Sequence, residues 1–171
     1  MIKKISISTI CIMILSVLFH FMYKWFPCTL TSIFFPVNES IWEHGKMIIM
    51  AFIFYILIEK FIFKENTNII FSNLLACDTC IILDFVIFTP IFLYIMETKD
   101  NMIVTIGIYL LCIIISLIIK EKIYKKEKDD KKEIIAIICF VFMIIFFAVL
   151  SYHPIKLPIF YDYNKNIYGI K

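Results

Sequence analysis

The chain has 171 residues, of which 62% are hydrophobic, and its mean hydropathy is +0.93. This composition excludes a soluble globular protein, because too few polar residues remain to cover a water-facing surface. The formal net charge is +3, but all 17 basic residues are lysines. They flank hydrophobic runs and do not form the basic face that binds nucleic acid, so we expect no nucleic-acid partner.

Long apolar runs predict an all-α, polytopic transmembrane helical bundle with about five spans. The first run covers residues 5–26 and follows two lysines. It begins like a signal peptide, but no small-x-small cleavage motif follows its apolar part, so we expect a retained first span. Two prolines in residues 27–40 then predict a connection that is not a long helix.

The second predicted span covers residues 41–63 and starts with a capping motif. Ser40 and Glu43 have the spacing of a capping box, in which a hydroxyl and a carboxylate each satisfy a free N–H group at a helix start. The third run, residues 69–96, has 28 residues. It exceeds the ~20 residues that a bilayer requires, so we expect tilt or a kink, with Pro90 at the kink.

The fourth and fifth predicted spans cover residues 102–119 and 134–152. The segment between them carries seven lysines and five acidic residues, which predicts a solvated loop. Residues 153–171 form a polar tail. The whole chain, 1–171, is expected to be a single integral membrane domain.

The distribution of lysines predicts a multi-pass protein of the cell membrane with its N-terminus inside and its C-terminus outside. In that orientation the inner segments hold eleven lysines and the outer segments six, as the positive-inside rule favours. The lipid bilayer is then the main partner. The same topology places all three histidines, His20, His44 and His153, on the outer face.

The densest polar segment, residues 36–44, is the best candidate for a functional site. Carboxylate and imidazole groups are the ligands that Zn²⁺ and similar divalent metals use. The candidate metal ligands are therefore His20, His44, His153 and Asp162, where Asp162 could instead support the ligands. The candidate catalytic carboxylates are Glu39, Glu43 and Asp84. In a helix that starts near Ser40, Glu39 and Glu43 are four residues apart and would lie on one helical face. No HExxH motif is present to dictate a metal.

A structural interpretation of the same segment is also open. Asn38 and Ser40 have the side chains that cap helix starts, and acidic residues are favoured at a helix N-terminus. Trp42 would then lie in the headgroup region of the bilayer, as interfacial tryptophans do. In this interpretation the segment is a capped, amphipathic turn that neither binds a metal nor takes part in catalysis.

Two aspartates fall inside the third predicted span. An ionisable group at membrane depth costs roughly 2.5–3.5 kcal/mol on insertion scales, so Asp78 and Asp84 are either functional or hydrogen-bonded between helices. Asp84 lies nearer the predicted outer face. Cys77 and Cys80 form a CxxC pair, but they lack the βαβ context of a thioredoxin-type site.

Three segments of the chain carry distinctive motifs: residues 20–25 (HFMYKW), residues 35–44 (FPVNESIWEH, with the string PVNESxWEH) and the tail motifs PIFYD (158–162) and YGI (168–170). These three signatures resemble those of an uncharacterised family of small bacterial multi-span membrane proteins. The chain has Gly45 where the family pattern predicts Leu. The resemblance implies a helical membrane protein with a domain of unknown function, and it implies no activity. The three signatures coincide with the segments that the lysines place outside.

Three functions remain open from the sequence. The protein could be a structural or accessory subunit that binds a protein partner through Trp42 and the tyrosine-rich tail. It could be a membrane-embedded, metal-assisted hydrolase that acts on a small amphiphile at the outer interface. It could also be a small transporter or channel component, in which Asp78 and Asp84 line a polar path.

Overall fold

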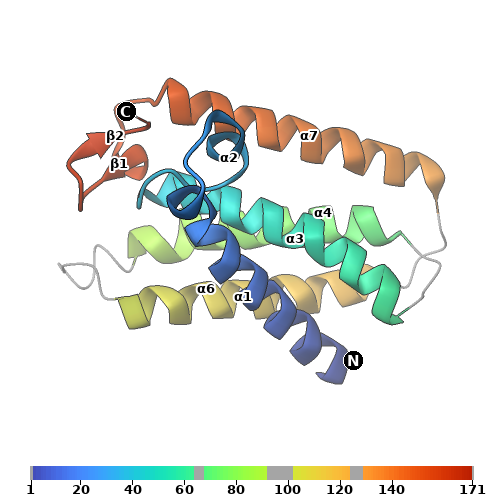
Figure 1. The fold of residues 1–171 in the computed structure, drawn as a ribbon. Coiled ribbons are helices and arrows are strands. Elements are labelled where there is room, and N and C mark those ends of the chain that lie inside the picture. The colour runs from blue at the N-terminus through green and yellow to red at the C-terminus, as the bar shows by residue number, and fades with distance from the viewer. Residues whose placement is uncertain (1, 64–67, 92–101, 124–128, 171) are drawn as a thin grey trace.

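The computed structural model describes residues 2–63, 68–91, 102–123 and 129–170. Within these residues, five long helices run up and down through one bundle (Figure 1). They are α1 (Ile2–Trp25), α3 (Ile41–Phe63), α4 (Ile69–Ile82), α6 (Met102–Ile123) and α7 (Asp130–Tyr152). The predicted class, an all-α transmembrane bundle, is confirmed.

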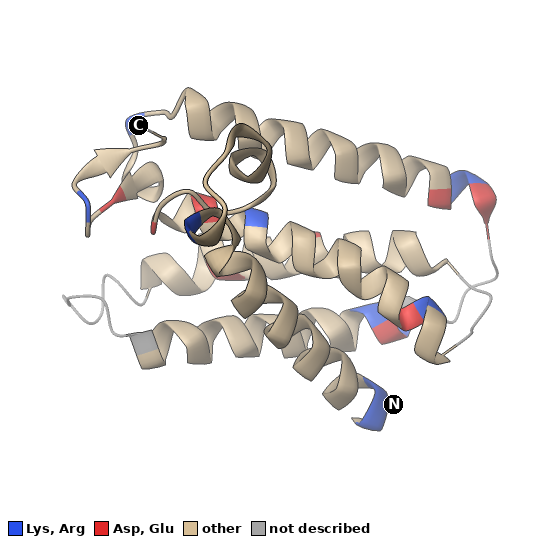
Figure 2. Ribbon diagram, in the orientation of Figure 1, with Lys and Arg blue, Asp and Glu red and all other residues tan. Residues whose placement is uncertain are grey.

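The bundle has two ends with different content. One end holds the N-terminus, the start of α4 and the start of α7, and we name it the lysine end (Figure 1). The other holds the chain between α1 and α3 and the C-terminal tail, and we name it the tail end. Charged residues gather towards these two ends, whereas the middle stretches of the helices are almost free of them (Figure 2). This pattern is expected for helices that cross a bilayer.

In the part of the chain that the structure describes, four helices are long and apolar enough to span a membrane. They comprise residues Ile2–Trp25, Ile69–Ile91, Ile103–Lys122 and Asp130–Tyr152. The second predicted span, α3, carries charges near both ends and is mostly buried by the other helices. That α3 itself crosses the bilayer stays a prediction.

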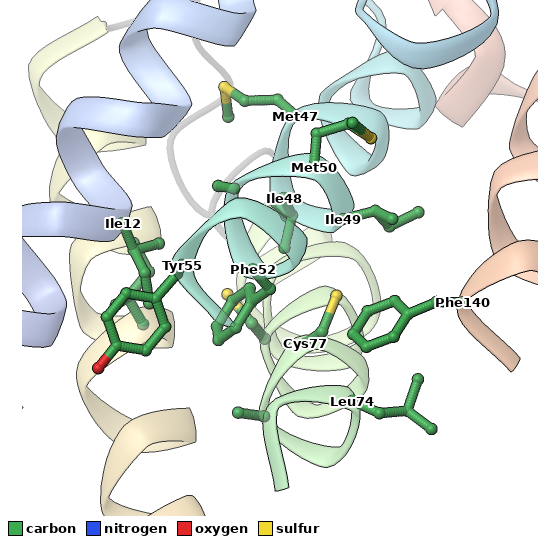
Figure 3. Packing of buried hydrophobic residues seen from close by; sticks show 14 of the residues in the cluster. Ile12, Met47, Ile48, Ile49, Met50, Phe52, Tyr55, Leu74, Cys77 and Phe140 are labelled. Atoms are coloured by element: carbon green, nitrogen blue, oxygen red, sulfur yellow. The ribbon is translucent and has the colours of Figure 1, made fainter. Parts of the chain in front are cut away.

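The centre of the bundle is an apolar core built around α3 (Figure 3). Ile48 and Phe52 of α3 are fully buried, and they pack with residues of α1, α4 and α7 such as Ile12, Cys77 and Phe140. Hydroxyl pairs add polar links between helices: the Ser8 and Tyr55 oxygens lie 2.5 Å apart. Such pairs hold helices together where lipid gives no hydrophobic driving force.

The irregularity predicted at Pro90 lies one turn earlier. Residues Leu83–Phe88 form a π-helical turn, η1, in which the Thr89 N–H donates to the Asp84 carbonyl five residues back. Pro90 has no N–H to donate to the carbonyl of Val86, which loosens the preceding turn. Single π turns occur frequently at functional sites. The end of the predicted third span, residues 92–96, lies outside the described residues.

The connection and the tail contain local structure that the sequence analysis did not predict. A short helix, α2 (Thr29–Phe34), lies inside the connection. The tail forms a 3₁₀ turn, η2 (Pro158–Phe160), followed by two antiparallel strands, β1 (Tyr161–Asp162) and β2 (Ile167–Tyr168). This small hairpin packs at the tail end of the bundle (Figure 1).

Candidate metal centre

Three side chains from different parts of the chain converge at the tail end. His20 comes from the last turns of α1, Glu39 from the loop before α3, and His44 from the first turn of α3. The His20 Nε2 atom lies 3.6 Å from Glu39 Oε1, and the His44 Nε2 atom lies 3.5 Å from Glu39 Oε2. The two imidazole rings are stacked, with centroids 5.4 Å apart.

The spacing of these groups fits a metal ion. One ligand atom from each residue can be chosen so that all three lie within 4.8 Å of one another. In a tetrahedral zinc site with bonds of about 2.0–2.1 Å, ligand atoms are about 3.4 Å apart, so small side-chain movements would complete the site. The side chains of His20, Glu39 and His44 are 23%, 43% and 27% exposed, so an ion can reach them from water.

The charge state of the Glu39 carboxylate suits a metal ligand. Its hydrogen bond with His44, together with the nearby His20 and Lys165, lowers its pKa below the ordinary value of 4.5. Glu39 is therefore ionised at neutral pH, which is the form that binds metal.

A cavity of about 300 Å³ adjoins the cluster. His20 and Glu39 form part of its wall, beside residues from the end of α1, the loop before α3 and the β1–β2 turn. The cluster therefore borders space that a small ligand could enter.

The C-terminal tail holds the Glu39 loop in place. The Glu39 backbone N–H donates to Asp162 Oδ2 at 3.0 Å, and the Asn38 side-chain amide donates to the Gly169 carbonyl at 2.8 Å. Gly169 has a φ of +61°, and a Cβ there would lie 2.4 Å from the Ser151 carbonyl oxygen, so this close contact needs glycine. The loop and tail signatures are thus two halves of one hydrogen-bonded unit.

Asp162 serves this unit and is not part of the cluster. Its carboxylate is fully buried and also accepts the N–H groups of Asn164 and Lys165, which closes the β1–β2 turn. Among the described residues, His153 is likewise outside the cluster. It is exposed and follows the last residue of α7, although it lies at the same end of the bundle as His20 and His44.

Glu43 points into the protein, away from Glu39. Its buried carboxylate pairs with Lys46 Nζ at 3.0 Å, accepts the Val37 N–H at 3.1 Å and accepts the Ser151 hydroxyl. Glu39 and Glu43 do not share a helical face, because α3 begins at Ile41 and Glu39 precedes it. The structure therefore places Glu43 outside the cluster of His20, Glu39 and His44. Only half of the predicted capping box forms: Ser40 Oγ accepts the Glu43 N–H, but the Glu43 carboxylate reaches Val37 instead of Ser40.

Trp42 is buried inside the protein. Its ring stacks on Phe147 of α7 with centroids 4.2 Å apart, and its Nε1–H donates to the Phe147 carbonyl. Gly45 makes this packing possible, because a Cβ there would lie 2.2 Å from the Phe147 ring. The contact fixes the first turn of α3, and with it His44, against α7.

The two aspartates of the third span differ in their relation to the cluster. Asp84, in η1, is buried and close enough to His44 for the two to interact electrostatically. Asp78 lies nearly two helical turns earlier along α4 and is half-buried. The structure thus brings Asp84 towards the candidate site, whereas for Asp78 it indicates no such interaction.

A second polar cluster, at the lysine end, was missed by the sequence analysis. Glu59 and Lys120 are almost fully buried and their charged groups lie 2.5 Å apart. Asn73 donates to Glu59 Oε2 at 2.7 Å, and Lys4 lies near Glu59 and Glu121. In the sequence, Lys4 and Lys120 flank predicted spans, where the lysines were interpreted as topology signals. The one available clue was that Glu59 interrupts an otherwise apolar stretch of α3.

Comparison with known proteins supplies the family and no activity. No curated protein and no solved structure matches the chain. One family model, described as a family of unknown function (DUF6512), matches residues 1–170, nearly the whole chain. The chain therefore belongs to DUF6512, in agreement with the resemblance seen in its signatures.

Proposed function

We propose that this protein is a membrane-embedded, metal-dependent hydrolase that acts on an amphiphile at the tail end of the bundle. In this proposal His20, Glu39 and His44 hold a divalent metal such as zinc. The observation that carries the proposal is the convergence of these three side chains beside a cavity of about 300 Å³.

The ligand set supports a catalytic site over a structural one. Structural zinc sites are closed by four protein ligands, whereas catalytic sites use three, two histidines and a glutamate among them, and keep one position open. Here three ligands come together next to a cavity. A metal bound there would lower the pKa of its water ligand and polarise a carbonyl or phosphoryl oxygen.

The residues around the ligands have positioning roles in this proposal. Asp84 would act on His44 electrostatically, because a nearby carboxylate raises the basicity of a metal-bound histidine. Asp162 and Asn38 would keep Glu39 in place through the hydrogen bonds described above. Catalytic geometry of this kind depends on such support, since small displacements of a reacting group are costly.

The two alternatives have weaker support. A partner-binding surface was expected to include Trp42, but Trp42 is packed inside the protein. A transport path was expected to include both Asp78 and Asp84, but of these two described residues only Asp84 is close enough to His44 for an electrostatic interaction. That the tail end faces the outside of the cell, as the lysines predict, remains part of the proposal.

Cobalt substitution tests the metal site without depending on activity. The purified chain, stripped with a chelator, would be titrated with Co²⁺ in detergent, and a four-coordinate site should give intense visible absorption bands. His44→Ala should abolish these bands, and the matched control His153→Ala should leave them intact. Bands of equal intensity in both variants, or none in the parent, would contradict the site.

Hydrolysis is then tested directly. The zinc-loaded protein would be incubated with short-chain carboxylic esters and phosphoesters, and the products identified by mass spectrometry. We expect turnover that is lost after chelation and restored by zinc, and that is absent in Glu39→Gln. If a zinc-loaded protein hydrolyses none of these amphiphiles, the hydrolase proposal fails while the metal site stands.

A further inference from the structure

From the charge of the cavity we infer its ligand class: the cavity next to His20 and Glu39 takes the phosphate group of a lipid headgroup. This inference rests on the proposed function and names its substrate class. Two lysines, Lys24 and Lys165, line the cavity, whereas Glu39 is the one carboxylate in its wall as far as the described residues define it.

The two lysines reach the cavity from separate elements. Lys24 lies one helical turn after His20 in α1, and Lys165 lies in the β1–β2 turn, where its N–H donates to Asp162 Oδ1 at 3.0 Å. Lys24 is close enough to His20, and Lys165 close enough to Glu39, for electrostatic interactions. Both side chains are exposed, so their ammonium groups remain available to a ligand.

The resulting charge favours an anion. A divalent metal and two ammonium groups, set against one carboxylate, leave the cavity strongly positive. Positive charge that lines a concave site concentrates anionic ligands and raises their association rates. A neutral ester would leave this charge without a partner.

The type of cation favours phosphate. Lysine binds phosphate as a point charge, and a tetrahedral phosphate has oxygens to share between a metal and two ammonium groups. The volume of about 300 Å³ is at the small end of the range for ligand sites, which suits a headgroup without its acyl chains.

The surroundings of the cavity favour a lipid over a soluble phosphate ester. Trp25 and Phe26 follow Lys24 directly, and their side chains are 52% and 61% exposed. Exposed aromatic residues at the end of a spanning helix mark the headgroup level of a bilayer. The cavity therefore lies at the depth of the lipid phosphates.

Binding measurements on the full chain test this inference. The probes are dioctanoyl phosphatidic acid, the uncharged dioctanoylglycerol, and glycerol 3-phosphate, each titrated calorimetrically into zinc-loaded protein in detergent. The test variant is Lys24→Gln with Lys165→Gln. Its control is Lys60→Gln with Lys156→Gln, which removes the same charge at exposed sites away from the cavity.

We expect phosphatidic acid to bind at least tenfold more tightly than dioctanoylglycerol, and the test variant to lose about tenfold in affinity, in line with the strength of charge-assisted hydrogen bonds. The control should bind like the parent, and all three proteins should hold the same amount of zinc. Equal affinity for the two diacyl probes, or equal losses in the test and control variants, would overturn the inference. Glycerol 3-phosphate binding as tightly as phosphatidic acid would overturn the lipid assignment.

The same titrations on chelator-treated protein separate this inference from the proposed function. If the parent binds no zinc but still binds phosphatidic acid through the two lysines, the metal-dependent hydrolase fails and the phosphate site stands. If zinc binds and the lysine variant shows no loss of phosphatidic acid affinity, the phosphate site fails and the metal site stands.

Discussion

Replacement of Gly45 by alanine tests how the first turn of α3 is held. A Cβ at this position would lie 2.2 Å and 2.7 Å from the Cε1 and Cζ atoms of Phe147, and 2.9 Å from Cζ of Phe85. Phe147 is 5% exposed and is stacked on Trp42 at 4.2 Å, so its ring has no free space to move into. The added methyl group must therefore displace packed rings.

The expected cost follows from this overlap. Overpacking a filled core by one methyl group costs about 1–3 kcal/mol. Alanine also favours a helix over glycine by about 1 kcal/mol, which partly offsets the clash. Gly107→Ala in α6 supplies the control, because a Cβ there meets no atom within 4 Å. The helix-propensity gain is common to both variants, so their difference reports the clash alone.

Thermal unfolding in detergent, followed by tryptophan fluorescence, measures this difference. For a chain of this size each kcal/mol shifts the Tm by about 2–4 °C, so Gly45→Ala should melt about 2–12 °C below Gly107→Ala. Equal Tm values for the two variants would refute the argument that Phe147 fills the space over Gly45. They would also remove our explanation for why glycine replaces the leucine that the family pattern predicts.

Three further predictions concern the two polar clusters. Asp162→Ala removes the acceptor of the Glu39 N–H and should weaken zinc binding about 10–100-fold. Competition with a chelating dye measures this affinity, and an unchanged value would contradict the positioning role of Asp162. Lowering the pH should release zinc while Glu39 is still ionised, because the lowered pKa of Glu39 keeps that carboxylate charged until below pH 4.5, whereas protonation of an imidazole removes a ligand. Zinc that stays bound until Glu39 itself protonates would show that the histidines are not ligands. Glu59→Gln should destabilise the protein by about 3–5 kcal/mol, because it removes the carboxylate that lies 2.5 Å from the buried Lys120 ammonium group. In chemical unfolding, Glu59→Leu with Lys120→Met should recover most of this loss, and a single variant as stable as the parent would contradict the pairing.

The sequence predicted the helices well, because lipid leaves the backbone few choices. A chain segment in the hydrocarbon region must satisfy its own N–H and C=O groups, so long apolar runs become helices. The predicted second span, 41–63, coincides with α3, and the other predicted spans differ from the helices by a few residues within the described part of the chain. The lysine-based topology also placed His20, His44 and His153 at one end of the bundle, as the structure does.

Side-chain roles were harder to predict, for reasons that differ between residues. Tryptophan has two favourable locations in a membrane protein, the interface and a core site where its N–H finds a partner, and the Phe147 carbonyl makes Trp42 a core residue. Glu39 and Glu43 were expected on one helical face, but the Asn38 side chain accepts the Ser40 N–H and keeps Glu39 in a turn before the helix. The pairing of Glu59 with Lys120 depends on how α3 and α6 align, which no local pattern specifies.

Metal content is the most direct test of the central claim, that His20, Glu39 and His44 form a metal site. The full chain, His44→Ala and His153→Ala would be purified in detergent with zinc supplied, desalted, and measured by mass spectrometry of the elements. We predict about one equivalent of zinc in the parent and in His153→Ala, as one three-ligand site implies, and its loss in His44→Ala. Absence of zinc from the parent, or equal zinc in all three proteins, would contradict the claim.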